Sequence, residues 1–265
     1  MESHTAVAVA PREAAGPSIF ARHQFLIKRL FSLTGLFFSG YVVVHLLTNA
    51  SVLAGPAMFQ EGVNRIHSLG PILPLVEWVF LFLPIIFHSI VGWGIILGAS
   101  PNLGDYRYSG NVRYTLQRVT AIILFFFILG HVLHMHQLGA MFGGGLFKPE
   151  QASSSMASAL QSALWIQLFY ALGVFSAAFH VGNGIWTAGI TWGLWTSAAA
   201  QRRANKIAVA LGLLVMLLGV LAIIGARRVN VSEARQIEER MEIEHRKLRG
   251  ELVPAEPAAS AAAPE

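Results

Sequence analysis

The chain has 265 residues, of which 54% are hydrophobic and only 12% are charged, and its formal net charge at pH 7 is +5. An ordinary soluble domain carries about 25% charged residues, so this composition excludes a water-exposed globule and indicates a protein that lies mostly in a bilayer. Cysteine is absent, which excludes disulfide bridges, iron–sulfur ligation and thiolate chemistry in this chain and leaves histidine as the candidate metal ligand.

Five apolar stretches predict five transmembrane helices, because each is long enough to cross about 30 Å of hydrocarbon. The segment before them, residues 1–27, mixes charged and small residues without the apolar core of a secretory signal, and we expect a flexible cytoplasmic leader. We therefore predict an all-α integral membrane protein with its transmembrane domain in residues 28–226. The predicted helices cover residues 29–53, 72–99, 119–141, 163–195 and 207–226.

Lysine and arginine are unevenly distributed outside these stretches. The short loops of one side contain only Arg65 and Lys148. By the positive-inside rule the richer side is cytoplasmic, which predicts a multi-pass protein of a bacterial inner membrane with a cytoplasmic N-terminus and an external C-terminus. A basic inner surface suits anionic lipid headgroups of the bilayer, so no nucleic-acid partner is expected. The richer side collects Arg12, Arg22, Lys28, Arg29, Arg107, Arg113, Arg118, Arg202, Arg203 and Lys206.

The last segment, residues 227–265, is predicted to be an external tail. Glutamate alternates with arginine and lysine over residues 231–249, which indicates a solvated charged helix. Residues 254–264 are rich in alanine and proline and cannot form a core. A disordered extension is favoured here over a helix that docks on the membrane domain.

One histidine lies deep in each of the first four predicted helices: His45, His88, His131 and His180. One such residue could be a neutral histidine bonded to a neighbouring helix, but four in four consecutive helices indicate function, because a buried ionisable group in a bilayer is costly. The helical rise places His45 and His131 about 20–24 Å from the inner boundary, and His88 and His180 about 22–24 Å from the outer boundary. We therefore predict an outer pair, His45 with His131, and an inner pair, His88 with His180, in a four-helix bundle.

Two bis-histidine sites at two depths favour two haem b groups as the cofactor. Zinc prefers four ligands, and a proton relay needs carboxylates, whereas Glu77 is the one acidic residue inside the predicted helices. Glycines beside His88, His131 and His180 leave room for a porphyrin, although close helix packing also uses glycine. Covalent attachment of haem would need cysteine, so non-covalent binding is expected.

The segments around these histidines resemble the single-chain cytochrome b subunit of the succinate:quinone oxidoreductases, in its five-helix dihaem form. The matching stretches are KRLFSLTG (28–35) with VVHLL around His45, FLPIIFHSIVGWGI around His88, LQRVTAI with LGHVLHMH around His131, and FHVGNGIWTAGITWG (179–193), the most specific of them. The resemblance implies that His45 and His131 ligate the iron of the outer haem, and that His88 and His180 ligate that of the inner haem.

The resemblance also implies partners and a role. The chain would anchor a flavoprotein subunit with FAD and an iron–sulfur subunit of succinate dehydrogenase, and would pass electrons through two haems b to a membrane quinone, with menaquinone expected. The dicarboxylate active site would then lie outside this chain. Some menaquinone fumarate reductases of the family carry a glutamate two residues before the fourth ligand. Ala178 stands there in this sequence, which favours succinate oxidation.

Four polar residues at the inner ends of the first and third helices are candidate partners of haem propionates. Ser32 matches a family position associated with a propionate, whereas Arg29, Gln117 and Arg118 are chosen by charge and position. The two arginines could equally be interfacial anchors. Asn183 could orient a ligand or hydrogen-bond across helices.

Near the outer surface, His134 follows His131 by one helical turn and could in principle replace it as a ligand. We prefer His131, which lies deeper, and assign His134 and His136 to the outer interface. Three other functions stay open: the cytochrome b anchor of a nitrate reductase, formate dehydrogenase or hydrogenase, a transporter, and an anchor without haem. The distribution of one histidine per helix disfavours the first, and the scarcity of intramembrane carboxylates disfavours the second.

Overall fold

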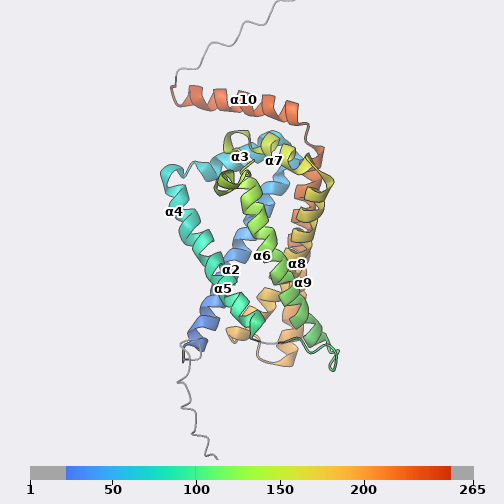
Figure 1. Cartoon of the computed structure of the whole chain (residues 1–265). Coiled ribbons are helices and arrows are strands. Elements are labelled where there is room, and N and C mark those ends of the chain that lie inside the picture. Colours follow the sequence, from blue (N-terminus) through green and yellow to red (C-terminus); the bar gives the residue numbers. More distant parts are fainter. Residues whose placement is uncertain (1–21, 99, 252–265) are drawn as a thin grey trace, which may run out of the picture.

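The computed structural model describes residues 22–98 and 100–251, and this part of the chain is built from helices and connecting loops without a strand (Figure 1). Five helical spans are long and apolar enough to cross a membrane: Gln24–Ala54, Gly70–Leu97, Ser109–Met135, Leu164–Thr191 and Ala198–Arg228. The predicted fold class, an all-α membrane protein with five transmembrane helices, is confirmed. Residues 1–21 of the predicted leader lie outside the described residues, as does the Ala/Pro-rich end, whereas residues 24–27 belong to the first helix and are not part of a flexible leader.

Three of the spans consist largely of one long helix each, namely α6 (Ser109–Met135), α8 (Leu164–Thr191) and α9 (Ala198–Arg228). The first span is α2 (Gln24–Ala50), continued by the 3-10 turn η1 (Ser51–Ala54). In Figure 1 these helices run alongside one another between two ends. We call the end that carries α2's first residues and the 192–197 loop the inner end, and the opposite end the outer end, after the predicted orientation.

The second span is composite. It begins with the 3-10 turn η2 (Gly70–Ile72) and α4 (Leu73–Glu77), passes through the π-helical turn η3 (Trp78–Phe82), and continues as α5 (Leu83–Leu97). The amide of Leu83 donates to the carbonyl of Trp78, five residues back. Pro84 follows, and it has no amide hydrogen and would clash with the carbonyl four residues before it, so the helix widens at this point.

The helices pack unequally. The α8 helix lies closest to α9, where a Cβ atom on Gly182 would stand 2.7 Å from the Ala208 carbonyl oxygen. A Cβ on Gly212 would likewise stand 2.9 Å from the Ala178 oxygen, so both glycines are needed for this approach. The α2 helix contacts α5, α8 and α9, whereas α5 makes few contacts with α6.

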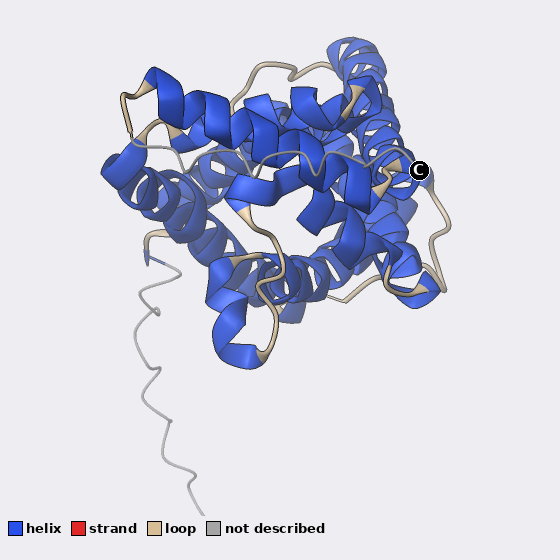
Figure 2. Cartoon of the chain, turned by 90° about the horizontal axis from the view of Figure 1, so that it is seen from above, coloured by secondary structure: helices blue, strands red, loops and turns tan. Residues whose placement is uncertain are grey.

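Short helices cover the outer end. They are α3 (Pro56–His67), η4 (Gln137–Phe142), η5 (Pro149–Gln151) and α7 (Ala152–Gln161). A buried apolar cluster ties them to the ends of the long helices, with Phe59 of α3, Met156 of α7 and Tyr170 of α8 among its members. Seen from above in Figure 2, helices lie across this end of the molecule.

The charged segment after α9 folds as α10 (Val231–Leu248) and lies on α3 and α7. Its Glu238 is 1% exposed. The carboxylate accepts hydrogen bonds from the Ser153 amide at 2.6 Å, the Ser154 amide at 3.0 Å and the Ser154 hydroxyl at 2.5 Å. These donors belong to the first turn of α7, where the helix dipole favours an anion. The charged segment is thus helical, as predicted, but it docks on α3 and α7, whereas the sequence favours a disordered extension over a docking helix.

Candidate cofactor site

The four deep histidines meet in two pairs. The ring centres of His45 in α2 and His131 in α6 lie 5.9 Å apart, and the ring planes form an angle of 79°. The ring centres of His88 in α5 and His180 in α8 lie 6.5 Å apart, with an angle of 81°. These are the partners that depth along the helices predicts. Each pair joins two helices that are far apart in sequence.

The spacing within each pair fits one metal ion between two imidazoles. Such rings have centres about 6 Å apart, because each ligating nitrogen lies about 2 Å from the metal and about 1 Å from its own ring centre. Among residues 22–98 and 100–251, no group of three or more His, Asp or Glu side chains is arranged so that it could hold a metal ion. A zinc site with four closed ligands therefore has no counterpart here, whereas a haem iron needs only two axial ligands from the protein.

The inner pair is held by neighbouring helices. The Nδ1 atom of His88 lies 3.1 Å from the Phe31 carbonyl oxygen of α2, and the Phe31 ring stacks on the imidazole with centres 4.1 Å apart. The Nδ1 atom of His180 lies 3.4 Å from the Thr120 hydroxyl oxygen of α6. That hydroxyl donates to the Leu116 carbonyl at 2.7 Å, so it can accept from the imidazole.

The outer pair has different neighbours. The Nδ1 atom of His131 lies 3.1 Å from the Tyr170 hydroxyl of α8. For His45, the contact is to the other ring nitrogen: Nε2 lies 3.5 Å from the Asn49 amide nitrogen of the same helix, while Tyr41 stacks on the ring at 5.5 Å. Three of the four histidines therefore engage a protein oxygen through Nδ1, which leaves Nε2 for a metal, as is usual for ligating histidines.

The side chain of His134 lies beside Tyr170, with Nδ1 3.3 Å from the hydroxyl, whereas His131 faces His45. This geometry favours His131 over His134 as the partner of His45. His136 directly follows α6. Its ring nitrogen accepts a hydrogen bond from the Leu138 amide at 3.3 Å, so it caps the turn η4.

The predicted propionate partners separate into three places. Ser32 accepts a hydrogen bond from the Trp192 indole at 3.1 Å, and the Arg29 guanidinium lies 4.7 Å from the centre of the same indole ring. Arg118 lies over the Tyr114 ring at 3.4 Å, and its Nε is buried without a hydrogen-bond partner in the described part of the chain. A buried guanidinium N–H is costly to leave unpaired, so Arg118 retains a donor for an anionic group.

Gln117 belongs to a hydrogen-bonded network that joins α6, α8 and α9. Its amide nitrogen donates to the His180 carbonyl at 3.2 Å, and its oxygen accepts from Asn183 at 2.7 Å. The Arg113 guanidinium donates to the Asn183 oxygen at 2.9 Å and to the Asn205 oxygen at 3.0 Å. Asn183 thus bonds across helices rather than to a histidine ring. Sequence reasoning missed Arg113, which it counted only among the inner positive charges.

Three glycines near the histidines are each needed for a different close contact. Gly182 allows the contact with α9, and a Cβ on Gly130 would stand 2.8 Å from the Phe169 ring. Gly35 is the glycine that abuts a paired histidine, since its Cβ would stand 2.8 Å from Cε1 of His88. The sequence offered a signal for it, because Gly35 ends the matching stretch KRLFSLTG.

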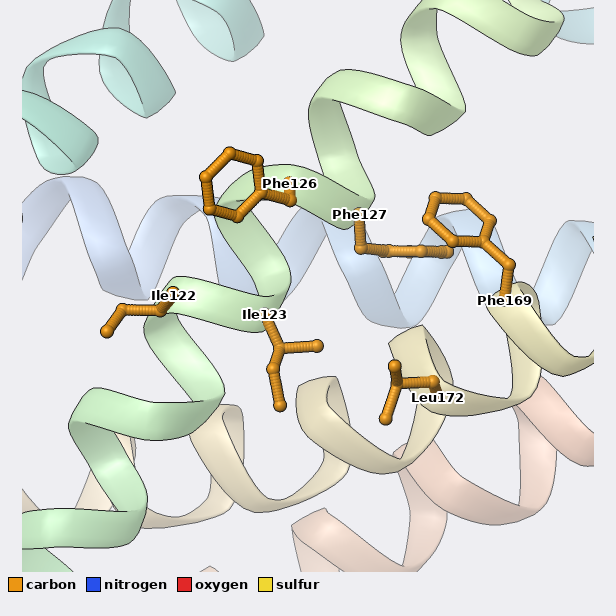
Figure 3. A pocket seen from close by; sticks show the side chains of 6 residues that line it. All are labelled: Ile122, Ile123, Phe126, Phe127, Phe169 and Leu172. Carbon is orange, nitrogen blue, oxygen red and sulfur yellow. The ribbon is translucent and has the colours of Figure 1, made fainter.

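An apolar cavity of about 240 Å³ opens between α6 and α8 (Figure 3). Phe127 lines this cavity and also contacts the outer pair, because its ring stacks on His131 with centres 5.9 Å apart. Because its walls are apolar side chains, the cavity can bind a molecule by shape but offers it no side-chain hydrogen bond. It is lined by Ile122, Ile123, Phe126, Phe127, Phe169 and Leu172.

Two comparisons with known proteins agree with this architecture. Residues 98–221 match the model of the succinate dehydrogenase/fumarate reductase transmembrane subunit family. The chain is 32% identical over 201 residues to the succinate dehydrogenase cytochrome b558 subunit of Bacillus subtilis (strain 168), an alignment that covers 76% of this chain and 96% of that protein. The chain therefore belongs to the succinate dehydrogenase/fumarate reductase family of cytochrome b membrane subunits.

Proposed function

We propose that this chain is the dihaem cytochrome b anchor of a bacterial succinate dehydrogenase, which conducts electrons from an iron–sulfur subunit to a membrane quinone, with menaquinone expected. The observation that carries the proposal is the pairing of four histidines from four helices at two separate sites. Two non-covalent haems b would supply the one-electron carriers, one at each site.

In this proposal the residues of the chain orient and shield the two sites. His45 and His131 would hold the iron of the outer haem, and His88 and His180 would hold that of the inner haem. Phe31 and Thr120 fix the tautomer and direction of the inner imidazoles through their contacts with Nδ1. The long helices keep the sites in a water-poor interior, which restricts the exchange of protons with the carriers.

Positively charged and polar side chains at the inner end support a position of the haem propionates there. Arg118 has a buried donor without a partner in the described residues, and Ser32 and Arg29 meet at the Trp192 indole. We assign these three residues to the propionates of the inner haem. Gln117 takes a different role, because both ends of its amide are engaged with α8, and we propose that it fixes the backbone of His180.

The proposed partners are supported by the absence of cysteine from the sequence and by the position of the basic residues. Without cysteine it cannot hold iron–sulfur clusters, so an iron–sulfur subunit and a flavoprotein subunit with FAD are proposed to dock at the basic inner end. In this proposal the N-terminus lies in the cytoplasm and the C-terminal tail lies outside the inner membrane.

Succinate oxidation is the proposed direction. Ala178, which stands where some fumarate reductases of the family carry a glutamate, is 4% exposed and packs in a cluster with Val181 and Val215. The interface between α8 and α9 is tight at this point, since a Cβ on Gly212 would stand 2.9 Å from the Ala178 oxygen. The burial of Ala178 supports this direction, because a longer, proton-carrying side chain would have to displace the neighbours packed around it.

The test is a reduced-minus-oxidised spectrum with a pyridine haemochrome assay on the purified complex. We expect two haems b per copy of this chain, both low-spin as bis-histidine ligation requires. One haem per chain would show that one histidine pair is not a ligand pair. A complex without haem would overturn the proposal.

A further inference from the structure

The Tyr170 hydroxyl lies between two histidines of α6. It is 3.1 Å from Nδ1 of His131 and 3.3 Å from Nδ1 of His134, and the residue is 9% exposed. His131 belongs to the outer pair, whereas His134 lies one turn closer to the outer end. Among the described residues, Tyr170 is the side chain that links a paired histidine to a second histidine.

The ring of Tyr170 is fixed by its surroundings. The Phe127 and Phe169 rings contact it nearly edge-on, with centres 5.6 Å and 5.8 Å away. Tyr170 also belongs to the buried cluster that closes the outer end. The hydroxyl is therefore held in place by packing, and no water-filled space is needed to bring it to the histidines.

The number of protons available determines which group donates in each of the two hydrogen bonds of Tyr170. A tyrosine hydroxyl has one proton, so it can donate to only one of two imidazoles and must accept from the other. On the proposed function, Nε2 of His131 ligates the metal and Nδ1 therefore carries the ring proton. His131 then donates to the Tyr170 oxygen, and Tyr170 donates to Nδ1 of His134. Each bond polarises the next and strengthens it.

We propose that Tyr170 is the positioning residue of the outer site, which orients His131, raises its basicity and thereby lowers the reduction potential of the outer haem, with His134 reinforcing the effect. The inference rests on the proposed function, because it needs His131 as a ligand. A ligand that donates a hydrogen bond gains anionic character and stabilises the oxidised iron. Among the described residues, the Nδ1 atoms of the inner pair contact Phe31, Thr34 and Thr120 and are not linked to a further histidine.

The decisive variant is Tyr170→Phe, which keeps the ring and removes the hydroxyl. One buried hydrogen bond is lost, so we expect the reduction equilibrium of the outer haem to shift towards the reduced form by up to about tenfold, equal to about 59 mV for one electron. The potential of the inner haem should stay unchanged. His134→Leu should shift the outer haem in the same direction by less, because Tyr170 remains as the acceptor.

The matched control is Tyr41→Phe. Tyr41 stacks on His45, the partner of His131, but its contact with that histidine is through the ring. Its hydroxyl can be removed without removing a hydrogen bond to either outer histidine, so both potentials should stay at their original values. The same control reports any general effect of a Tyr→Phe change near the outer site.

The readout is a spectroscopic redox titration of the purified complex, together with its haem content. Equal potentials in Tyr170→Phe and the unaltered protein, with both haems retained, would overturn the inference, as would an equal shift of both haems. If Tyr170→Phe loses the outer haem, His134→Leu decides, because an unchanged outer potential there also overturns it. Failure of the proposed function is seen separately, as an unaltered complex that lacks two haems.

Discussion

Gly35 of α2 lies directly against the His88 imidazole of α5, at a place where a Cβ atom would stand 2.8 Å from Cε1. The first helix thus lacks a side chain at the point where the ring of the second span needs space. The same helix also offers the Phe31 carbonyl to Nδ1 of this ring. One turn of α2 therefore determines both the position and the direction of His88.

Gly35→Ala should displace His88 and weaken the inner haem site. The neighbouring atom belongs to a ring held by stacking and by a hydrogen bond, so relief of the overlap must tilt the His88 imidazole. We expect a broadened or partly lost signal of the inner haem in the reduced-minus-oxidised spectrum, with the outer signal retained. Gly40→Ala is the control, since a Cβ at Gly40 meets nothing within 4 Å.

His88→Ala should remove the inner haem and largely spare the outer one. The variant removes one of the two histidines proposed to hold the inner iron, while the outer pair lies on α2 and α6 and does not involve α5. Haem content should fall from two to one per chain, and the remaining haem should keep its potential. Loss of the outer signal alone would refute the pairing.

Glu238→Ala should release α10 from the outer end. The change leaves two buried amides and one hydroxyl of α7 without their acceptor, each at a cost of about 1–3 kcal/mol. We expect faster proteolysis and hydrogen exchange in residues 231–248, with both haems retained. Glu239→Ala is the matched control, because this neighbouring glutamate is exposed, and equal protection of α10 in the two variants would contradict the prediction.

Asn183→Ala should loosen the inner end of the bundle. It removes the acceptor of one Arg113 bond and the donor to Gln117, so α8 loses two of its polar contacts with α6, while the bond from Arg113 to Asn205 of α9 remains. The inner haem absorbance should then be lost at a lower temperature during heating in detergent. Asn205→Ala removes only one bond to Arg113 and should lower that temperature less. A larger decrease of this temperature in Asn205→Ala than in Asn183→Ala would contradict the prediction and show that the bond from Arg113 to α9 is the more important one.

The architecture and the histidine pairs could be predicted because both follow from one-dimensional regularities. Apolar length predicts the spans, and the helical rise predicts that His45 and His131 share one depth while His88 and His180 share another. No tertiary knowledge is needed, provided that the helices run alternately up and down.

The contacts that orient the histidines could not be predicted in this way. Tyr170 and His131 are 39 residues apart, and their contact depends on how α6 and α8 are rotated towards each other. Arg113 looks like any other positive charge at the inner boundary until Asn183 and Asn205 are seen beside it. Glu238 is one of eight glutamates in the tail, and only docking against α7 distinguishes it.

The π-helical turn at Trp78–Phe82 contains one residue more than an α-helical turn. One additional residue in a helical turn rotates everything beyond it by about 100°. Loss of one residue within 78–82 would therefore turn Glu77 and the preceding turn to a new face, while His88 kept its direction towards His180. The π-helical turn therefore sets the direction of Glu77 relative to that of His88 within one span.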